Sequence, residues 1–164
     1  MTRYAKILKA DIANGIGFRT TIFFTGCPFR CKGCFNSSIW DPSTGKEYTA
    51  EVQEKVLKEC RDLNCRGLSL LGGEPTADWN IETVIGLCKQ FKEELPKKDI
   101  WMWSGRLMKE IKELPKGEEL LSYLDVVIDG PFVQELHDMK LKWKGSSNQT
   151  IWRKRLGKWT KDLI

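Results

Sequence analysis

Thr25-Gly26-Cys27-Pro28-Phe29-Arg30-Cys31-Lys32-Gly33-Cys34-Phe35-Asn36 is the stretch around which the rest of the chain is arranged. Three cysteines, Cys27, Cys31 and Cys34, lie within eight residues, directly after the apolar run Thr21–Phe24. Thiolates so close in sequence can converge only on one small object, a metal ion or a cluster. A four-iron cluster is usually held by four cysteine thiolates, so three local ligands would leave one iron free to bind a small molecule. The spacing therefore predicts an iron–sulfur site.

Other uses of the cysteines stay open at this point. A zinc site of three cysteines and one histidine is a known structural set, but the one histidine, His137, lies far away in a polar stretch. A disulfide framework is less favoured, because no secretory leader is seen and clustered cysteines in an intracellular enzyme are typical of metal binding or catalysis. Cys60 and Cys88 lie on predicted helix faces, which favours core packing, whereas Cys65 is left undecided.

Length and composition are those of an ordinary soluble protein. The 164 residues predict a single domain over 1–164, and no apolar run is long enough to span a membrane. We expect a cytoplasmic protein, because no targeting segment is seen and the cysteines are expected to be reduced. The net charge is +5, with basic residues crowding the chain from Lys140 onward. That charge is either a solvated surface or a docking site for an acidic partner protein; no motif indicates nucleic acid.

Hydrophobic periodicity predicts alternating strands and helices. Strands are expected over residues 4–10, 19–24, 67–71, 99–103, 123–128 and 150–153, and helices over 49–63, 80–95 and 106–114. The alternation predicts an α/β fold with a mainly parallel sheet. About four strand–helix units are too few to close an eight-stranded barrel, so we expect an open, partial β/α barrel.

Each chemically distinctive segment directly follows a predicted strand. These segments are the cysteine loop, Gly72-Gly73-Glu74, Ser104-Gly105 and Asp129-Gly130. Because the carboxyl ends of parallel strands share one edge, where ligands bind, we expect these segments to meet around the cluster. The glycine pair lets backbone approach a zwitterionic group, unless it is a plain turn. Ser104 and Asp129 can hydrogen-bond a ribose or an amino group, or simply form turns.

The cysteine motif also resembles that of the radical S-adenosylmethionine enzymes, and Gly72-Gly73-Glu74-Pro75 resembles their methionine-binding segment. More narrowly, the chain is similar to the anaerobic ribonucleoside-triphosphate reductase activating proteins over residues 4–150. The segments that carry this narrower resemblance are Gly33-Cys34-Phe35-Asn36, Asp99–Gly105, Asp125–Phe132 and Gly145-Ser146-Ser147-Asn148-Gln149.

This resemblance implies a radical S-adenosylmethionine fold and mechanism. Cys27, Cys31 and Cys34 would hold a [4Fe-4S] cluster, with S-adenosylmethionine on the open iron. Gly33, Cys34 and Phe35 would contact its adenosyl part and Gly73 its methionine part. Reductive cleavage would give methionine and a 5'-deoxyadenosyl radical, which would generate a glycyl radical on the large subunit of the reductase. The cofactors carry this chemistry, so no side chain is expected to be catalytic; the electron donor would be a reductant protein such as a flavodoxin.

The chain departs from the family pattern in three places, and rival functions remain. Phe29 stands where the group often has histidine, Gly33 replaces an aromatic residue common in the superfamily, and the basic extension 151–164 has no assigned role. The rivals are an activator of another glycyl-radical enzyme of the pyruvate formate-lyase type, a small radical enzyme such as a deazaguanine-forming synthase, and a non-catalytic zinc or iron–sulfur module.

Overall fold

An eight-stranded mixed sheet carries the fold in the computed structural model, which describes residues 1–162. Its strands are β1 (Arg3–Asp11), β2 (Arg19–Phe24), β3 (Lys46–Glu47), β4 (Gly67–Gly72), β5 (Asp99–Trp103), β6 (Val126–Asp129), β7 (Thr150–Arg155) and β8 (Lys158–Asp162). Their order in space is β3-β1-β2-β4-β5-β6-β7-β8, so the sheet is open rather than closed into a barrel.

The middle of the sheet is parallel and its two flanks are antiparallel. Strands β2, β4, β5 and β6 pair in parallel, whereas β1 and β3 flank them on one side and β7 and β8 on the other, all in antiparallel pairs. The sheet as a whole is therefore mixed, not mainly parallel as the strand–helix alternation predicted. For two of these pairs the reason is local: a short connection between β1 and β2, and a tight hairpin between β7 and β8, permit only antiparallel pairing.

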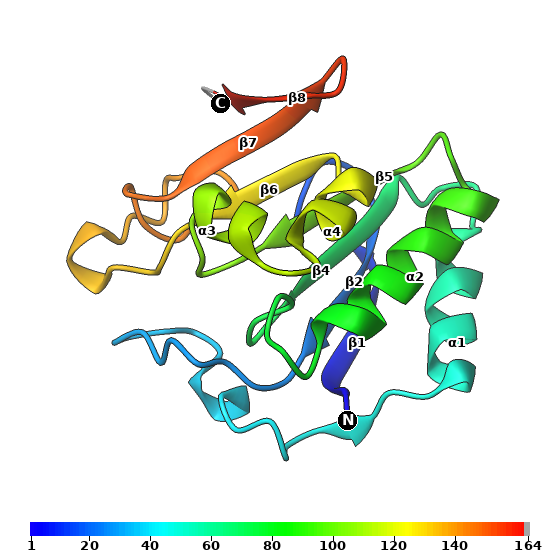
Figure 1. The fold of residues 1–164 in the computed structure, drawn as a ribbon, viewed down its shortest axis with the longest axis horizontal. Coiled ribbons are helices and arrows are strands. Elements are labelled where there is room, and N and C mark those ends of the chain that lie inside the picture. The colour runs from blue at the N-terminus through cyan, green and yellow to red at the C-terminus, as the bar shows by residue number, and fades with distance from the viewer. Residues whose placement is uncertain (163–164) are drawn as a thin grey trace.

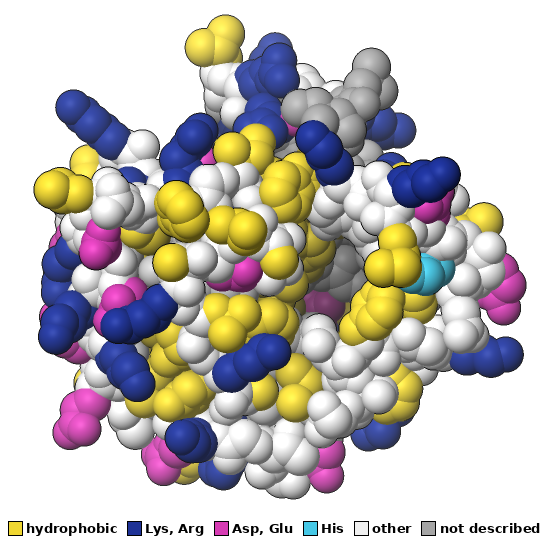
Figure 2. All heavy atoms as spheres, turned by 180° about the vertical axis from the view of Figure 1, so that it is seen from behind, with side chains coloured by type: hydrophobic (Ala, Val, Ile, Leu, Met, Phe, Trp, Pro, Cys, Tyr) yellow, Lys and Arg dark blue, Asp and Glu magenta, His cyan; other side chains and the backbone are white. Residues whose placement is uncertain are grey.

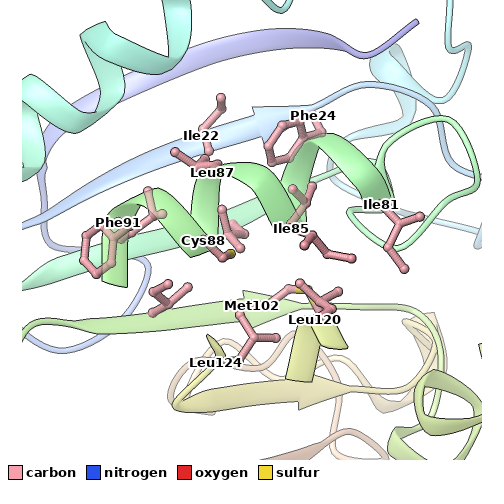
Figure 3. Close-up of a cluster of buried hydrophobic side chains, with 14 of the residues drawn as sticks. Ile22, Phe24, Ile81, Ile85, Leu87, Cys88, Phe91, Met102, Leu120 and Leu124 are labelled. Atoms are coloured by element: carbon pink, nitrogen blue, oxygen red, sulfur yellow. The ribbon is translucent and has the colours of Figure 1, made fainter. Parts of the chain in front are cut away.

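Four α-helices cover one face of the sheet (Figure 1). They are α1 (Ala50–Cys60), α2 (Ile81–Glu94), α3 (Met108–Glu113) and α4 (Gly117–Tyr123); short 3-10 turns occupy Ser37–Ile39 and Gln134–Leu136. Their apolar sides pack against alternate strand residues such as Ile22, Leu70 and Met102, which form the main core. Figure 3 shows the buried side chains of α2, Cys88 among them, lying over these strands. This arrangement confirms the α/β class.

The opposite face holds a smaller apolar cluster. Trp101, Val126, Ile128 and Ile151 are buried there, with Trp143 packed against them. Figure 2 views the molecule from this side and shows apolar side chains around a hollow. Trp101 and Met102 therefore serve different cores, because successive side chains of a strand point to opposite faces.

The observed elements differ from the predicted ones in several places. The predicted helix at 106–114 is shorter, and α4 ends at Tyr123, where a strand was expected to start, so that β6 starts only at Val126. Glu118 and Glu119 in the first turn of α4 suit the positive end of a helix, although Pro115 and Gly117 marked a break in the sequence. In the described part of the basic extension, β7 and β8 form a hairpin.

Within residues 1–162, no helix has the length and apolar character to cross a membrane.

Candidate functional site

A cavity of about 170 Å³ lies at the carboxyl edge of the parallel strands. It brings together segments that are far apart in the sequence, each following a different strand: the loop after β2, Gly72 and Gly73 after β4, Ser104 and Gly105 after β5, and Gly130 after β6. The convergence expected from the strand–loop pattern is therefore observed. It follows from parallel pairing, which puts the ends of β2, β4, β5 and β6 on one side.

The cysteine loop contributes all three of its thiols to this cavity. Cys27, Cys31 and Cys34 are free, partly exposed and among its lining residues. Hydrogen bonds anchor the start of the loop: Gly26 N donates to the Ile39 carbonyl at 2.8 Å, and Cys27 N to the Trp40 carbonyl at 2.9 Å. At its far end the Asn36 backbone N–H donates to Cys34 Sγ at 3.4 Å.

The thiols suit a cluster in their chemistry. Partial burial raises the pKa of Cys27, and the nearby Glu74 carboxylate adds to the effect. A raised pKa means that the Cys27 thiolate is costly to form. Binding to iron would offset this cost, because a thiol that binds a metal loses its proton. Within residues 1–162, no group of three or more His, Cys, Asp or Glu side chains is placed so that all of them could hold one metal ion. A four-iron cluster needs no such single point, since each thiolate binds a separate iron.

The glycine pair after β4 lies directly against the cysteine loop. A side chain at Gly73 would collide with the Gly26 carbonyl oxygen, so only glycine permits this approach. Two hydrogen bonds hold the contact: Glu74 N donates to the Gly26 carbonyl at 2.8 Å, and Asn36 Nδ2 to the Gly72 carbonyl at 3.0 Å. The pair is therefore more than a plain turn, because it fixes the floor of the cavity relative to the cysteines.

Glu74 joins the ends of β4 and β5. Its side chain is 1% exposed, and its carboxylate accepts hydrogen bonds from Ser104 Oγ and Gly105 N, both at 2.7 Å. It also accepts from Thr76 N at 3.1 Å and Thr76 Oγ1 at 2.7 Å. Ser104, a candidate ligand contact in the sequence, thus donates to Glu74. Both side chains shape the wall of the cavity.

Asp129 points away from the cavity. Its carboxylate accepts from Met108 N at 2.6 Å and from Thr150 N at 3.3 Å, and it is buried. These contacts place it at the start of α3 and of β7. The sequence suggested a ribose or amino-group contact, whereas the residue is absent from the lining of the cavity and anchors two elements.

An aromatic group borders the cavity on its open side. Phe35, which is 71% exposed, has its ring centroid 5.5 Å from that of Phe132 and 5.3 Å from that of His137. His137 Nδ1 lies 2.7 Å from the Gly145 carbonyl oxygen. Gly33 has a φ of +77°, a conformation that favours glycine, and lies against Gln134. Phe35 thus lines the cavity beside Cys34, whereas Gly33 does not line it and lies against Gln134.

Sequence reasoning missed the part of the wall that comes from the loop between β6 and β7. Phe132, Gly145 and Gln149 line the cavity. Gln149 Nε2 donates to the Gly130 carbonyl at 2.9 Å, and its Oε1 accepts from Gly145 N at 2.8 Å. The available signal was the segment 145–149, which resembles the activating proteins. Its sequence alone did not indicate that it braces the wall of the cavity.

Comparison with known proteins agrees with this geometry. The family described as 4Fe-4S single cluster domain matches residues 13–152. A protein of Vibrio cholerae named anaerobic ribonucleoside-triphosphate reductase-activating protein is 42% identical over 152 residues, covering 92% of this chain and 97% of its own. The chain belongs to this family of activating proteins.

Other activating proteins match over a similar span. The one from Haemophilus influenzae is 37% identical, covering 93% of this chain and 99% of its own, and the one from Escherichia coli is 35% identical, covering 90% and 96%. Membership in this activating-protein family, together with the 4Fe-4S match, supports an iron–sulfur cluster in this chain, as the cysteine spacing predicted.

Proposed function

We propose that this chain is a radical S-adenosylmethionine enzyme that activates anaerobic ribonucleoside-triphosphate reductase by generating a glycyl radical on its large subunit. The observation that carries the proposal is the single cavity lined by three cysteines and by backbone from the ends of three other parallel strands. A structural cluster would need the cysteines alone. Four converging strand ends provide a ligand site beside them.

Cys27, Cys31 and Cys34 would hold a [4Fe-4S] cluster. Their three thiols would leave one iron without a protein ligand, and Gly72 and Gly73 line the same cavity as the thiols. When bound, the cluster and S-adenosylmethionine would supply an electron and a 5'-deoxyadenosyl radical that removes a hydrogen atom from glycine. The protein positions and shields these groups.

The residues around the cysteines would orient S-adenosylmethionine. Gly73 lets its own backbone pack against Gly26 beside the cysteine loop, and it lines the cavity, where the charged groups of the methionine part would reach its backbone. Gly33, Cys34 and Phe35 would contact the adenosyl part, and the exposed ring of Phe35 offers a face on which an adenine can stack. Glu74 would act indirectly, by fixing the wall formed by Ser104 and Gly105.

The open sheet suits a macromolecular substrate, and we assign it to the partial-barrel type that the resemblance to radical S-adenosylmethionine enzymes implies. The chain is small and the mouth of the cavity is bordered by the exposed Phe35, so a glycine-bearing loop of a large protein can enter. A reductant protein such as a flavodoxin would supply the electron. All six cysteines are free, which is compatible with a reducing cytoplasm.

Electron paramagnetic resonance of the anaerobically reconstituted, reduced protein tests this proposal. We expect a cubane signal that changes when S-adenosylmethionine is added, and a glycyl radical when the reductase is then mixed in. Cys31→Ser should lose the signal, whereas Cys88→Ser, a buried cysteine of α2, should keep it. A cluster signal unaffected by S-adenosylmethionine would contradict the proposal, as would a radical formed on pyruvate formate-lyase and not on the reductase.

A further inference from the structure

Three aromatic rings form a closed triangle beside the proposed cluster site. Phe35 comes from the cysteine loop, whereas Phe132 and His137 come from the loop between β6 and β7. The ring centroids lie 5.5 Å apart for Phe35 and Phe132, 5.3 Å for Phe35 and His137, and 5.6 Å for Phe132 and His137. The pairs are tilted or edge-to-face, as aromatic pairs prefer. Each ring therefore packs against the other two.

The three rings differ in their access to the cavity. Phe35 and Phe132 line it together with the three cysteines, whereas His137 is absent from its lining. Phe35 remains 71% exposed within the triangle, so its two neighbours hold the ring without covering it. A side chain exposed to this extent would otherwise change rotamer freely on a fast timescale. His137 can thus influence a ligand in the cavity through the rings that it contacts.

The imidazole of His137 is itself held in place by the cavity wall. Its Nδ1 lies 2.7 Å from the Gly145 carbonyl oxygen and donates to it, because a carbonyl only accepts. Gly145 is fixed in turn, since its N–H donates to Gln149 Oε1 at 2.8 Å, and both residues line the cavity. The backbone of His137 also pairs with the buried Ser146 in an isolated antiparallel bridge. Side chain and backbone therefore both fix the position of this ring.

We infer that His137 is a positioning residue, which orients the ring of Phe35 for stacking on the adenine of bound S-adenosylmethionine. Phe35 contacts the adenosyl part only if the proposed function holds, so the role of His137 rests on that function. The contacts with His137 and Phe132 restrict the rotamers of Phe35 before the ligand arrives. Less conformational freedom is then lost on binding, and the affinity is higher.

Calorimetric titration of the cluster-loaded protein with S-adenosylmethionine tests this role. His137→Ala removes the ring, and we expect the affinity to fall about three- to tenfold, the range that the usual strength of an aromatic pair gives. The electron paramagnetic resonance signal of the cluster should not change. Met139→Ala is the control, because Met139 lies in the same loop, is 91% exposed and should not affect the affinity.

Two further variants separate the ring of His137 from its hydrogen bond. His137→Phe keeps a ring without the donor, whereas His137→Asn keeps a donor without the ring. We expect His137→Phe to restore most of the affinity and His137→Asn to restore little. A His137→Phe protein that binds as weakly as His137→Ala would overturn the inference. Because His137 is exposed, its substitution should leave the fold intact, which circular dichroism verifies.

A double-mutant cycle with Phe35 separates orientation of this ring from general support of the loop. Phe35→Leu removes the ring that His137 orients, so adding His137→Ala to it should cause no further loss of affinity. An equal loss in both backgrounds would show that His137 does not act through Phe35, and the inference would be wrong.

The proposed function and the role of His137 fail in different ways. A wild-type protein that does not bind S-adenosylmethionine would contradict the proposed function, and the role of His137 would fall with it. Wild-type binding with an unchanged affinity in His137→Ala would leave the proposed function standing and would overturn the role of His137 alone.

Discussion

Glu74 shows how a single buried carboxylate can hold two strand ends together. Four hydrogen bonds from donors on Thr76, Ser104 and Gly105 converge on its two oxygens. In Glu74→Gln one oxygen becomes an NH₂ group that faces donors, so at least one buried donor loses its acceptor. Hydrogen bonds to charged groups contribute about 1.5–3 kcal/mol each, and we expect the free energy of unfolding to fall by about 2 kcal/mol.

Urea unfolding of the apo protein measures this effect, and Glu82→Gln is its matched control. Glu82 forms an exposed ion pair with Lys116, at 2.7 Å, so its substitution should leave the free energy of unfolding nearly unchanged. Equal effects of the two substitutions would show that Glu74 does not brace the site.

Gly73 is a second residue at which the backbone itself is decisive. In Gly73→Ala the new Cβ meets the Gly26 carbonyl oxygen, which is backbone and cannot rotate away. We expect the floor of the cavity to shift away from the cysteines and the affinity for S-adenosylmethionine to fall at least about tenfold, equivalent to about 1.4 kcal/mol. Calorimetric titration of the cluster-loaded protein with S-adenosylmethionine measures this affinity.

Gly86→Ala is the control for Gly73→Ala. Gly86 lies within α2, where an added Cβ meets nothing within 4 Å. Alanine in place of a helical glycine should stabilise the fold by about 0.5–1 kcal/mol and leave S-adenosylmethionine affinity unchanged. Unchanged affinity in Gly73→Ala as well would remove Gly73 from the binding site.

Among the elements, α1 shows which local features the sequence predicts well. A helix was expected from residue 49, where threonine is a residue type that favours a helix cap, and Thr49 Oγ1 accepts a hydrogen bond from Val52 N at 3.2 Å. Thr49→Ala should therefore lower the free energy of unfolding by about 1 kcal/mol, whereas Thr49→Ser, which keeps the hydroxyl, should restore most of it. Thermal and urea denaturation of both variants would measure the difference; equal losses would mean that the cap contributes nothing.

The elements that were missed depend on information that is not local. Strands such as β4 and β5 were visible because both faces are buried and the apolar runs are continuous. The helix α4 follows Pro115 and starts at Gly117, so local signals indicated a break, and its formation depends on packing of Leu120 and Leu121 in the main core. β8 is mostly polar, with charges at Lys158, Lys161 and Asp162, and only its pairing with β7 makes it a strand.

At the scale of the whole molecule, the sequence predicted where the chemistry lies better than how the wall around it is built. Parallel strands fix a common edge, so loops after β2, β4 and β5 had to meet there. The identity of the cysteines and glycines then indicated the kind of site. The orientation of Asp129, which points away from the cavity, was not predictable. A carboxylate that follows a strand can bind a ligand or accept hydrogen bonds at the start of a helix equally well.

The convergence of these loops makes a prediction about the dynamics of the whole molecule. If the loops at 26–36, 71–76 and 103–106 form one site, S-adenosylmethionine added to the cluster-loaded protein should slow amide hydrogen exchange in all three together. The Lys154 amide, which donates to the Asp125 carbonyl at 2.9 Å between β7 and the start of β6, serves as the control and should be unaffected. Protection confined to the cysteine loop would mean that the cluster is a local structural element. Coupled protection of three loops that follow three different strands requires a ligand that touches them all, which is the arrangement that an activating enzyme needs.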